Sequence, residues 1–281
     1  MNRAAGELGF CRSAGVPKVA RAALHMWEEP VISGARGSGT IFFSGCSLGC
    51  IYCQNAEISR GLFGKEVSEE RLADIMLELE RRGAHNVNLV TGTHFAPSIV
   101  RAVSLARSAG LSVPVVYNTG SYDTPETIDM LKDSVVIWLP DLKYYRGKTA
   151  AAYSRAENLP EASRIAIDRM YEYAGTPVLD GEGIMQSGVI VRILLLPGHL
   201  AEAKLNLKYL YERYKDGVYV SLMSQYTPPE GMPSPLCRRV SAREYRELVS
   251  YAQTIGVKNA FVQDRSSAVS DFTPSFDLSG V

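Results

Sequence analysis

Residues 39–55 read GTIFFSGCSLGCIYCQN, and this stretch decides the fold. Residues 39–45 form a short apolar run of the kind that makes a buried strand. Cys46, Cys50 and Cys53 then follow at intervals of four and three residues. Because the glycines before the first and second cysteines disfavour a helix, we predict a loop that follows a strand and brings three thiols together.

The alternation of strand and helix continues beyond this loop. Further strands are predicted from apolar runs at residues 86–91, 113–118, 134–140, 189–196, 217–224 and 259–263. Helices are predicted between them, at residues 68–82, from 97, from 125, at 149–158, 161–174 and 200–215, and from 241. Continuously apolar strands that alternate with helices indicate a parallel sheet covered by helices.

The number of strand–helix units limits the architecture. Periodicity alone does not separate an open doubly wound sheet from a full or a partial barrel. A convincing eighth unit is missing, which disfavours a complete (β/α)8 barrel. We expect residues 1–38 to be an N-terminal extension that packs on the barrel without a clear strand of its own. Residues 39–281 are expected to form a single domain, and residues 270–281 a tail on its surface.

The composition narrows the class of protein. The chain has 281 residues with 30 basic and 30 acidic side chains, so its net charge is zero. That balance argues against a general electrostatic grip on nucleic acid. The chain shows neither an apolar run long enough to cross a membrane nor a secretion signal, and five cysteines is an odd number for disulfides. We therefore expect a cytoplasmic protein whose clustered cysteines act as ligands.

Three closely spaced thiols have three interpretations. They could form a small apolar stripe, since a thiol without a disulfide partner packs well in a core. They could bind zinc, although zinc usually takes a fourth Cys or His, and the next histidine is His85. They could also hold an iron–sulfur cluster, which is bound by Cys thiolates. A four-iron cluster with three protein ligands leaves one iron open to a small molecule, which suits catalysis.

The motif resembles that of a known superfamily. The pattern Cys-x3-Cys-x2-Cys, with Tyr52 just before the last cysteine and placed after the first strand of a βα series, resembles the radical S-adenosyl-L-methionine (SAM) superfamily. The stretches SGTIFFSGCSLGCIYCQNAEIS, LHMWEEPVISG, WLPDLKY and SLMSQYTPP look like uncharacterised relatives of pyruvate formate-lyase activating enzyme. This likeness covers roughly residues 5–280.

The resemblance implies a fold and an oxidoreductase chemistry. The fold would be a partial (β/α)6 barrel with an extra C-terminal strand. Cys46, Cys50 and Cys53 would bind one [4Fe–4S] cluster, and SAM would chelate its fourth iron through its amino and carboxylate groups. One-electron reduction would cleave SAM to methionine and a 5′-deoxyadenosyl radical that abstracts hydrogen from a substrate. An exposed cluster iron is sensitive to oxygen, so an anaerobic setting is expected. Cys11 and Cys237 are predicted not to be ligands.

SAM-binding residues are expected where the parallel strands end, since ligands of such folds bind at the carboxyl ends of the strands. Residues 91–94 read Thr-Gly-Thr-His, where the superfamily often has Gly-Gly-Glu to bind the SAM amino group. This chain has no acid there. The resemblance therefore implies that Thr91, Thr93 or His94 takes over that contact, and Tyr52 is a further candidate.

The next strand ends carry further candidates. In the activating enzymes the corresponding positions hold an Asp-Thr pair and an Asp-x-Lys that bind SAM, partly through a monovalent cation. Here Asp141 and Lys143 match, whereas Asn118 replaces the first acid. Thr119 and Ser121 complete the candidates at this strand end, and a monovalent cation near SAM is expected. The alternative for the Asp-x-Lys is a surface ion pair of little energetic value.

Two more candidates come from the later strands. Arg192 lies inside the apolar run at 189–196, where a charge is costly unless it is paired. It should point into the barrel and meet a carboxylate of SAM or of the protein, such as Asp141. Met223 ends the following strand, where the superfamily binds the adenine. For residues 25–30, HMWEEP, we favour a structural role over a place at the substrate mouth.

The expected function is that of a glycyl-radical-enzyme activase. It would be a monomer that takes electrons from a flavodoxin or ferredoxin and acts on a protein substrate. One alternative is a radical SAM enzyme that acts on another peptide or on a small molecule. Another is an iron–sulfur scaffold or regulator without radical chemistry, which the missing Gly-Gly-Glu acid keeps open. Nucleic acid and membrane partners are not expected.

Overall fold

Seven parallel strands form the centre of the structure, a computed structural model that describes residues 6–263 and 274–281. These strands are β2 (Ser38–Phe43), β4 (Val87–Val90), β5 (Val115–Thr119), β6 (Ile137–Pro140), β8 (Met185–Leu194), β9 (Tyr219–Met223) and β10 (Ala260–Val262). The full order across the sheet is β10-β9-β8-β6-β5-β4-β2-β1-β3, with β7 (Val178–Leu179) beside β8. The mixed α/β fold with a largely parallel sheet agrees with the sequence prediction.

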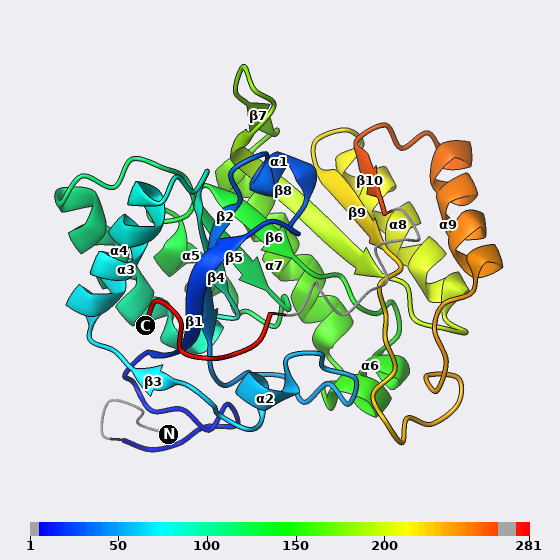
Figure 1. The fold of residues 1–281 in the computed structure, drawn as a ribbon. Coiled ribbons are helices and arrows are strands. Elements are labelled where there is room, and N and C mark those ends of the chain that lie inside the picture. The colour runs from blue at the N-terminus through cyan, green and yellow to red at the C-terminus, as the bar shows by residue number, and fades with distance from the viewer. Residues whose placement is uncertain (1–5, 264–273) are drawn as a thin grey trace.

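A layer of helices covers the outer face of the curved sheet (Figure 1). They are α3 (Glu69–Arg81), α4 (Ala96–Ser108), α5 (Pro125–Leu131), α6 (Gly147–Ser154), α7 (Leu159–Ala174), α8 (Leu200–Tyr214) and α9 (Ala242–Ile255). Three of these helices begin near residues 68, 125 and 241, as predicted, and the side chains of Ser68, Thr124 and Ser241 cap them. Each parallel strand from β2 to β9 is followed by at least one of these helices, and β10 is the extra strand.

The first strand corrects one expectation. Residues 1–38 were expected to hold no clear strand, but β1 (Lys18–His25) pairs antiparallel with β2 and with β3 (Lys65–Glu66). Its sequence, KVARAALH, is rich in residues that favour helices, so local propensity does not indicate a strand. Pairing on both sides determines its conformation, which no local pattern reveals.

The described part of the tail, residues 274–281, runs along β1 (Figure 1). Leu278 N donates to Ala20 O at 3.1 Å, and Ala22 N donates to Ser279 O at 2.8 Å. Most of this segment is exposed, as expected, but Phe276 is buried against Phe42, with ring centroids 5.5 Å apart. The remainder of the expected tail, residues 270–273, lies outside the described residues, as does Asp264 after the last strand.

The short helix α1 (Pro30–Ser33) closes the amino end of the barrel. Val31 and Ile32 are buried in a cluster with inward-facing strand residues such as Ile137 and Ile190. Asn86 Nδ2 also donates to Ile32 O at 2.7 Å. In Figure 1, α1 lies at the opposite end of the sheet from α2 (Ala56–Ser59). Access to the interior is therefore left at the carboxyl ends of the strands.

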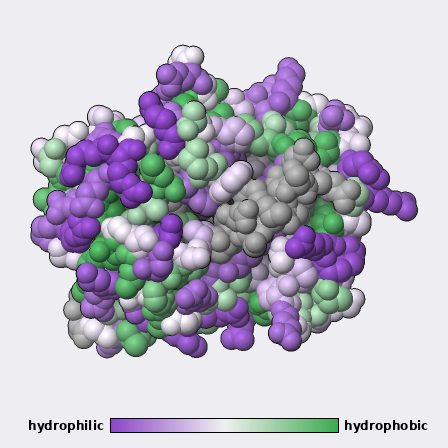
Figure 2. Space-filling model, viewed as in Figure 1, coloured by the Kyte–Doolittle hydropathy of each residue, from purple (hydrophilic) through white to green (hydrophobic). Residues whose placement is uncertain are grey.

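The outer surface has a mixed character. On the face shown in Figure 2, hydrophilic and hydrophobic residues are interspersed, and hydrophilic side chains project at the periphery. In the described part of the chain, no helix has both the length and the apolar character needed to span a membrane.

Candidate active site

The three clustered cysteines lie on the cysteine loop, defined as residues 45–55, which lies between the end of β2 and α2. Gly45 opens the loop with φ of +86°, and its N–H donates to Ile58 O at 2.9 Å. Further along, Ile51 N donates to Tyr153 O at 2.9 Å and Gly49 N to Ser154 O at 3.3 Å. Backbone hydrogen bonds to carbonyl oxygens of α2 and α6 therefore hold the loop in place.

A β-carbon on Gly45 would lie 2.5 Å from Ser13 Oγ and 2.7 Å from Cys11 O. Only glycine therefore combines the required backbone angle with the available space. The packing explains why the loop begins with a glycine, and it places Cys11 beneath the loop as a buried packing residue.

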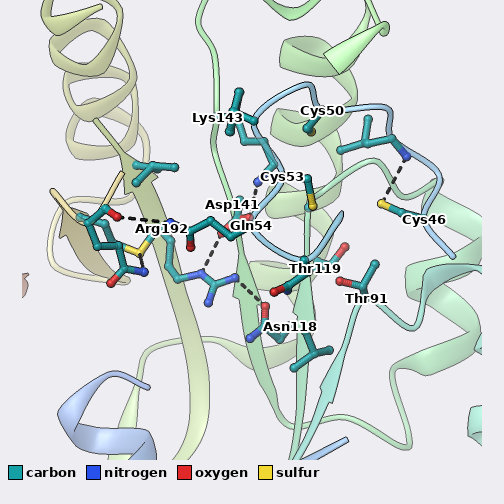
Figure 3. A pocket seen from close by; sticks show the side chains of 18 of the residues that line it. Cys46, Cys50, Cys53, Gln54, Thr91, Asn118, Thr119, Asp141, Lys143 and Arg192 are labelled. Carbon is teal, nitrogen blue, oxygen red and sulfur yellow. Dashed lines mark hydrogen bonds and ion pairs between the residues drawn. The ribbon is translucent and has the colours of Figure 1, made fainter. Parts of the chain in front are cut away.

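Cys46, Cys50 and Cys53 all line one cavity of about 240 Å³ at the carboxyl ends of the strands (Figure 3). Burial raises the pKa of Cys46 to about 12, and it also raises the pKa of Cys50, although the Lys143 charge and a Ser154 hydrogen bond oppose the rise. Without a bound metal the thiols of Cys46 and Cys50 therefore stay protonated at neutral pH, and metal binding displaces the proton.

The donor set fits an iron–sulfur cluster. In the described residues, no three His, Cys, Asp or Glu side chains stand close enough together to hold a single metal ion. A four-iron cluster takes each thiolate on a different iron, so the three sulfurs need not converge on one point. Three soft thiol ligands on one loop, all facing one cavity, meet that requirement.

A buried charge network lines the same cavity, and its Lys143 lies close to Cys50 (Figure 3). Arg192 Nε donates to Asp141 Oδ1 at 2.8 Å, and its Nη2 donates to Asn118 Oδ1 at 2.5 Å. Lys143 Nζ donates to the other oxygen of Asp141. The prediction that Arg192 points inward is correct, and Asp141 and Lys143 are both mostly buried rather than a surface pair.

Electrostatics within this network keep its members ionised. Burial alone would raise the pKa of Asp141, but the charges of Arg192 and Lys143 and their hydrogen bonds outweigh it and hold that pKa below its usual value. Burial would likewise lower the pKa values of Lys143 and Arg192, but the Asp141 carboxylate reverses the effect and raises both. One carboxylate thus holds two cations at the cavity wall.

The segment of residues 25–30 contributes to the cavity, contrary to the structural role that we favoured. His25, Trp27 and Glu28 line it. Glu28 Oε1 accepts from Asn88 Nδ2 at 3.1 Å and from Asn118 Nδ2 at 3.4 Å, and Oε2 lies 3.6 Å from Arg192 Nη1. Burial raises the pKa of Glu28, partly offset by the Arg192 charge. In the sequence, the only sign that this segment contributes to the cavity was the pair of adjacent acids next to a tryptophan.

Two candidate residues at strand ends have a left-handed backbone. Thr91, after β4, has φ of +59°, and Ser121, after β5, has φ of +60°. Such angles are unusual outside glycine, above all for a β-branched residue, and they concentrate at functional sites. Thr91 lines the cavity, whereas Ser121 is fully buried beside it.

Three of the expected SAM-binding residues do not line the cavity: Thr93, His94 and Ser121. Thr93 Oγ1 lies 3.0 Å from Tyr117 OH. His94 lies under the cysteine loop, where its Nε2 is 2.8 Å from Ser44 O. His94 sits in the 3-10 turn η2 (Thr93–Phe95), and its ring contacts the backbone just after β2 rather than the cavity.

Thr119 lines the cavity, but its hydroxyl is already engaged. It donates to Asp123 Oδ2 at 2.6 Å and accepts from Ser121 N at 3.1 Å. Asp123 is 4% exposed and also accepts from Tyr117 OH at 2.9 Å. The sequence analysis missed Asp123, a short polar residue just before the cap of α5. Its role is to fix the strand end that carries Thr119.

The remaining candidates lie in the cavity wall. Tyr52 and Met223 line it, as does Gln225, two residues after Met223. Tyr226 and Gln54 also line it, although the sequence analysis did not single them out. Gln54 Nε2 donates to Gln225 O at 3.3 Å, which connects the cysteine loop to the end of β9. Cys237 is exposed and lies outside this cavity.

Comparisons with known proteins place the chain in a family. Residues 40–199 match the family model described as the Radical SAM superfamily. The uncharacterized protein MJ0674 of Methanocaldococcus jannaschii is 28% identical over 229 residues, which make up 79% of this chain and 62% of that protein. The chain therefore spans less than two thirds of the length of that curated relative.

Two solved structures resemble the fold. One is Streptococcus suis SuiB bound to precursor peptide SuiA, with a TM-score of 0.53 and 11% identity over 76% of this chain and 46% of that chain. The other is HydG, a maturase of the [FeFe]-hydrogenase, with a TM-score of 0.52 and 16% identity over 76% of this chain and 48% of that chain. Since the family match covers more than half of the chain and includes its three clustered cysteines, the chain belongs to the radical SAM superfamily, whose members use a [4Fe–4S] cluster and SAM.

Proposed function

We propose that the chain cleaves SAM reductively and that its substrate is a glycyl radical enzyme, into which it introduces the radical. The observation that carries the first part is the placement of Cys46, Cys50 and Cys53 around the same cavity as the charges of Asp141, Lys143 and Arg192. The second part is supported by the sequence likeness to activating enzymes described above.

The polar side chains of the cavity suit the two ends of an amino acid. Lys143 carries a positive charge close enough to Cys50 to stabilise its thiolate, so it is suited to hold a carboxylate beside the cysteine loop. Asn118 and Thr91 supply neutral acceptors at the neighbouring strand ends. When bound, the cluster supplies the electron that splits SAM into methionine and the radical that removes hydrogen from the substrate.

The wall opposite the cysteine loop is suited to receive the substrate. Trp27 is 56% exposed although it lines the cavity, and Glu28 lies deeper beside it. The exposed aromatic ring in the cavity lining offers an apolar surface, and the Glu28 carboxylate can accept hydrogen bonds from peptide N–H groups. The chain's pairing with a particular glycyl radical enzyme, and with a flavodoxin or ferredoxin as electron donor, is part of the proposal.

The first experiment is anaerobic reconstitution of the chain with iron and sulfide, followed by dithionite reduction with SAM. We expect about four irons per chain and formation of 5′-deoxyadenosine. Cys50→Ala should abolish both, whereas Cys237→Ala is the matched control and should change neither. Bound iron without any 5′-deoxyadenosine would favour a scaffold or regulator, and the radical proposal would then be wrong.

A second experiment addresses the substrate. Incubation of the reduced chain and SAM with a candidate glycyl radical enzyme should give a glycyl radical signal by electron paramagnetic resonance (EPR). Formation of 5′-deoxyadenosine with peptides or small molecules, and no glycyl radical with any such enzyme, would contradict the activase proposal and leave SAM cleavage standing.

A further inference from the structure

A row of hydroxyl groups ends on one of the three clustered sulfurs. Tyr52 OH lies 2.7 Å from Tyr144 OH, Tyr144 OH lies 2.7 Å from Ser154 Oγ, and Ser154 Oγ lies 2.9 Å from Cys50 Sγ. These four residues, Tyr52, Tyr144, Ser154 and Cys50, are defined as the hydroxyl chain. The proposed function assigns no role to its three hydroxyls.

The other two sulfurs have weaker partners. Cys46 Sγ accepts from Leu48 N at 3.4 Å, and Cys53 Sγ lies 3.4 Å from Ser59 Oγ. Neither contact is as short as that of Cys50, and in the described residues neither is extended by further hydroxyls. Cys50 therefore differs from the other two cysteines because its sulfur contacts a series of linked hydroxyl groups.

The hydroxyl chain is built into the interior. Ser154 is 1% exposed, Tyr144 is 2% exposed and Tyr52 is 6% exposed. Ser154 is the last residue of α6, and its carbonyl oxygen accepts from Gly49 N at 3.3 Å, which fixes α6 to the cysteine loop. The hydroxyls cannot exchange their partners for bulk water, so the contacts persist.

When Cys50 is a metal-bound thiolate, the hydrogen bonds of the hydroxyl chain can run in only one direction. A thiolate has no proton, so Ser154 must donate to Cys50. Since a hydroxyl has only one proton, Tyr144 must then donate to Ser154, and Tyr52 must donate to Tyr144. All three O–H dipoles point toward the sulfur, and such an aligned series strengthens each bond within it.

We infer that Ser154, backed by Tyr144 and Tyr52, is a positioning residue that stabilises negative charge on Cys50 and raises the reduction potential of the cluster. The physical reason is that the reduced cluster carries one more negative charge, and hydrogen bonds to its sulfurs favour that state. The inference relies on the proposed function only in that the cysteine loop binds the cluster.

The test is an EPR-monitored redox titration of the reconstituted chain without SAM, after its iron content has been measured. Ser154→Ala should move the midpoint potential to a more negative value. Tyr144→Phe should move it less in the same direction, and Tyr52→Phe least, because each removes a more distant dipole. Ser154→Thr keeps the hydroxyl and should restore the potential.

Tyr153→Phe is the matched control. Tyr153 precedes Ser154 in α6, but its hydroxyl contacts His199 Nε2 at 3.0 Å rather than a cysteine, so its loss should leave the potential unchanged. If Ser154→Ala does not bind iron, the midpoint potential of Tyr144→Phe, which keeps Ser154, tests the inference instead. Equal potentials in iron-loaded variants and wild type would overturn this inference alone. A wild-type chain that binds no iron would overturn the proposed function as well.

Discussion

Arg192 and Asp141 form an ion pair inside the barrel, with Nε 2.8 Å from Oδ1 and side-chain exposures of 14% and 16%. Removal of Arg192 leaves the buried Asp141 carboxylate with Lys143 as its remaining cation, and it takes the positive charge away from the buried Glu28. We expect Arg192→Met to lower the free energy of unfolding by about 3–5 kcal/mol, measured by urea denaturation of the iron-free chain. Lys208→Met, at an exposed pair with Glu212, is the control and should cost less than about 1 kcal/mol. Equal losses in the two variants would contradict the importance of burial.

Cavity position should decide which candidates affect SAM binding. Lys143 lines the cavity, whereas His94 does not. We expect Lys143→Gln to weaken SAM binding to the reconstituted chain at least tenfold, about 1.4 kcal/mol, in equilibrium dialysis. His94→Gln should leave the affinity almost unchanged, provided that its melting temperature confirms a folded protein. Strong loss of SAM affinity in His94→Gln alone would restore the original sequence-based assignment.

The carboxylate of Glu202 supports the loop that follows Lys143. Its Oε2 accepts from Tyr145 N at 3.0 Å and from Arg146 N at 3.1 Å. Burial would raise the pKa of Glu202, but hydrogen bonds from His199, Thr149 and the two backbone amides lower it to about 2.

Stability from Glu202 should therefore depend on pH. Because its folded-state pKa is depressed, its contribution is complete above the unfolded value of about 4.3 and disappears as pH falls toward 2. We expect Glu202→Gln to cost about 3 kcal/mol at pH 7, with the difference from wild type narrowing below pH 4. Glu212→Gln on the exposed side of the same helix is the control. A difference that does not vary with pH would show that the charge is not responsible.

Substitutions at two glycines can distinguish the cost of backbone strain from the cost of steric crowding. Gly45 and Gly110 both have positive φ, at +86° and +104°. A β-carbon at Gly45 would meet Ser13 Oγ at 2.5 Å, whereas one at Gly110 would meet nothing within 4 Å. Gly110→Ala should thus cost about 1–2 kcal/mol from backbone strain.

Gly45→Ala should cost about 1–3 kcal/mol more than Gly110→Ala, because crowding adds to the same backbone strain. It should also reduce the iron content after reconstitution, since the displaced loop carries the three cysteines. Calorimetric melting and iron analysis measure the two effects. Full iron loading in Gly45→Ala would contradict this prediction, since the cysteine loop would then bind the cluster in spite of its displacement.

The parts of the site that local sequence determines were predictable. The cysteine spacing, the strand ends that carry Asp141 and Lys143, and the inward direction of Arg192 all follow from periodicity over a few residues. The placement of Asn118 and Thr119 at the cavity follows from the same rule that parallel strands end together.

The parts that depend on distant segments were not predictable. Strand β1 has a helix-favouring sequence and is set by its partners. Glu28 reaches the cavity only because α1 folds under the barrel, where Asn88 and Asn118 receive its carboxylate. His94 lies in a turn that follows the end of β4, and strand periodicity cannot resolve the direction of a side chain in such a turn. Contacts between residues far apart in sequence have no local signature.

The pairing of β1 with the tail has a consequence for synthesis of the protein. Arg21 on β1 donates to Ser275 O and Asp277 Oδ1, across separations of 254 and 256 residues. On a ribosome, β1 therefore emerges early, but its outer backbone groups at Ala20 and Ala22 wait for almost the whole chain before they are paired. Until then the nascent barrel carries an open strand edge next to His25 and the cavity wall, and such edges favour pairing with other chains.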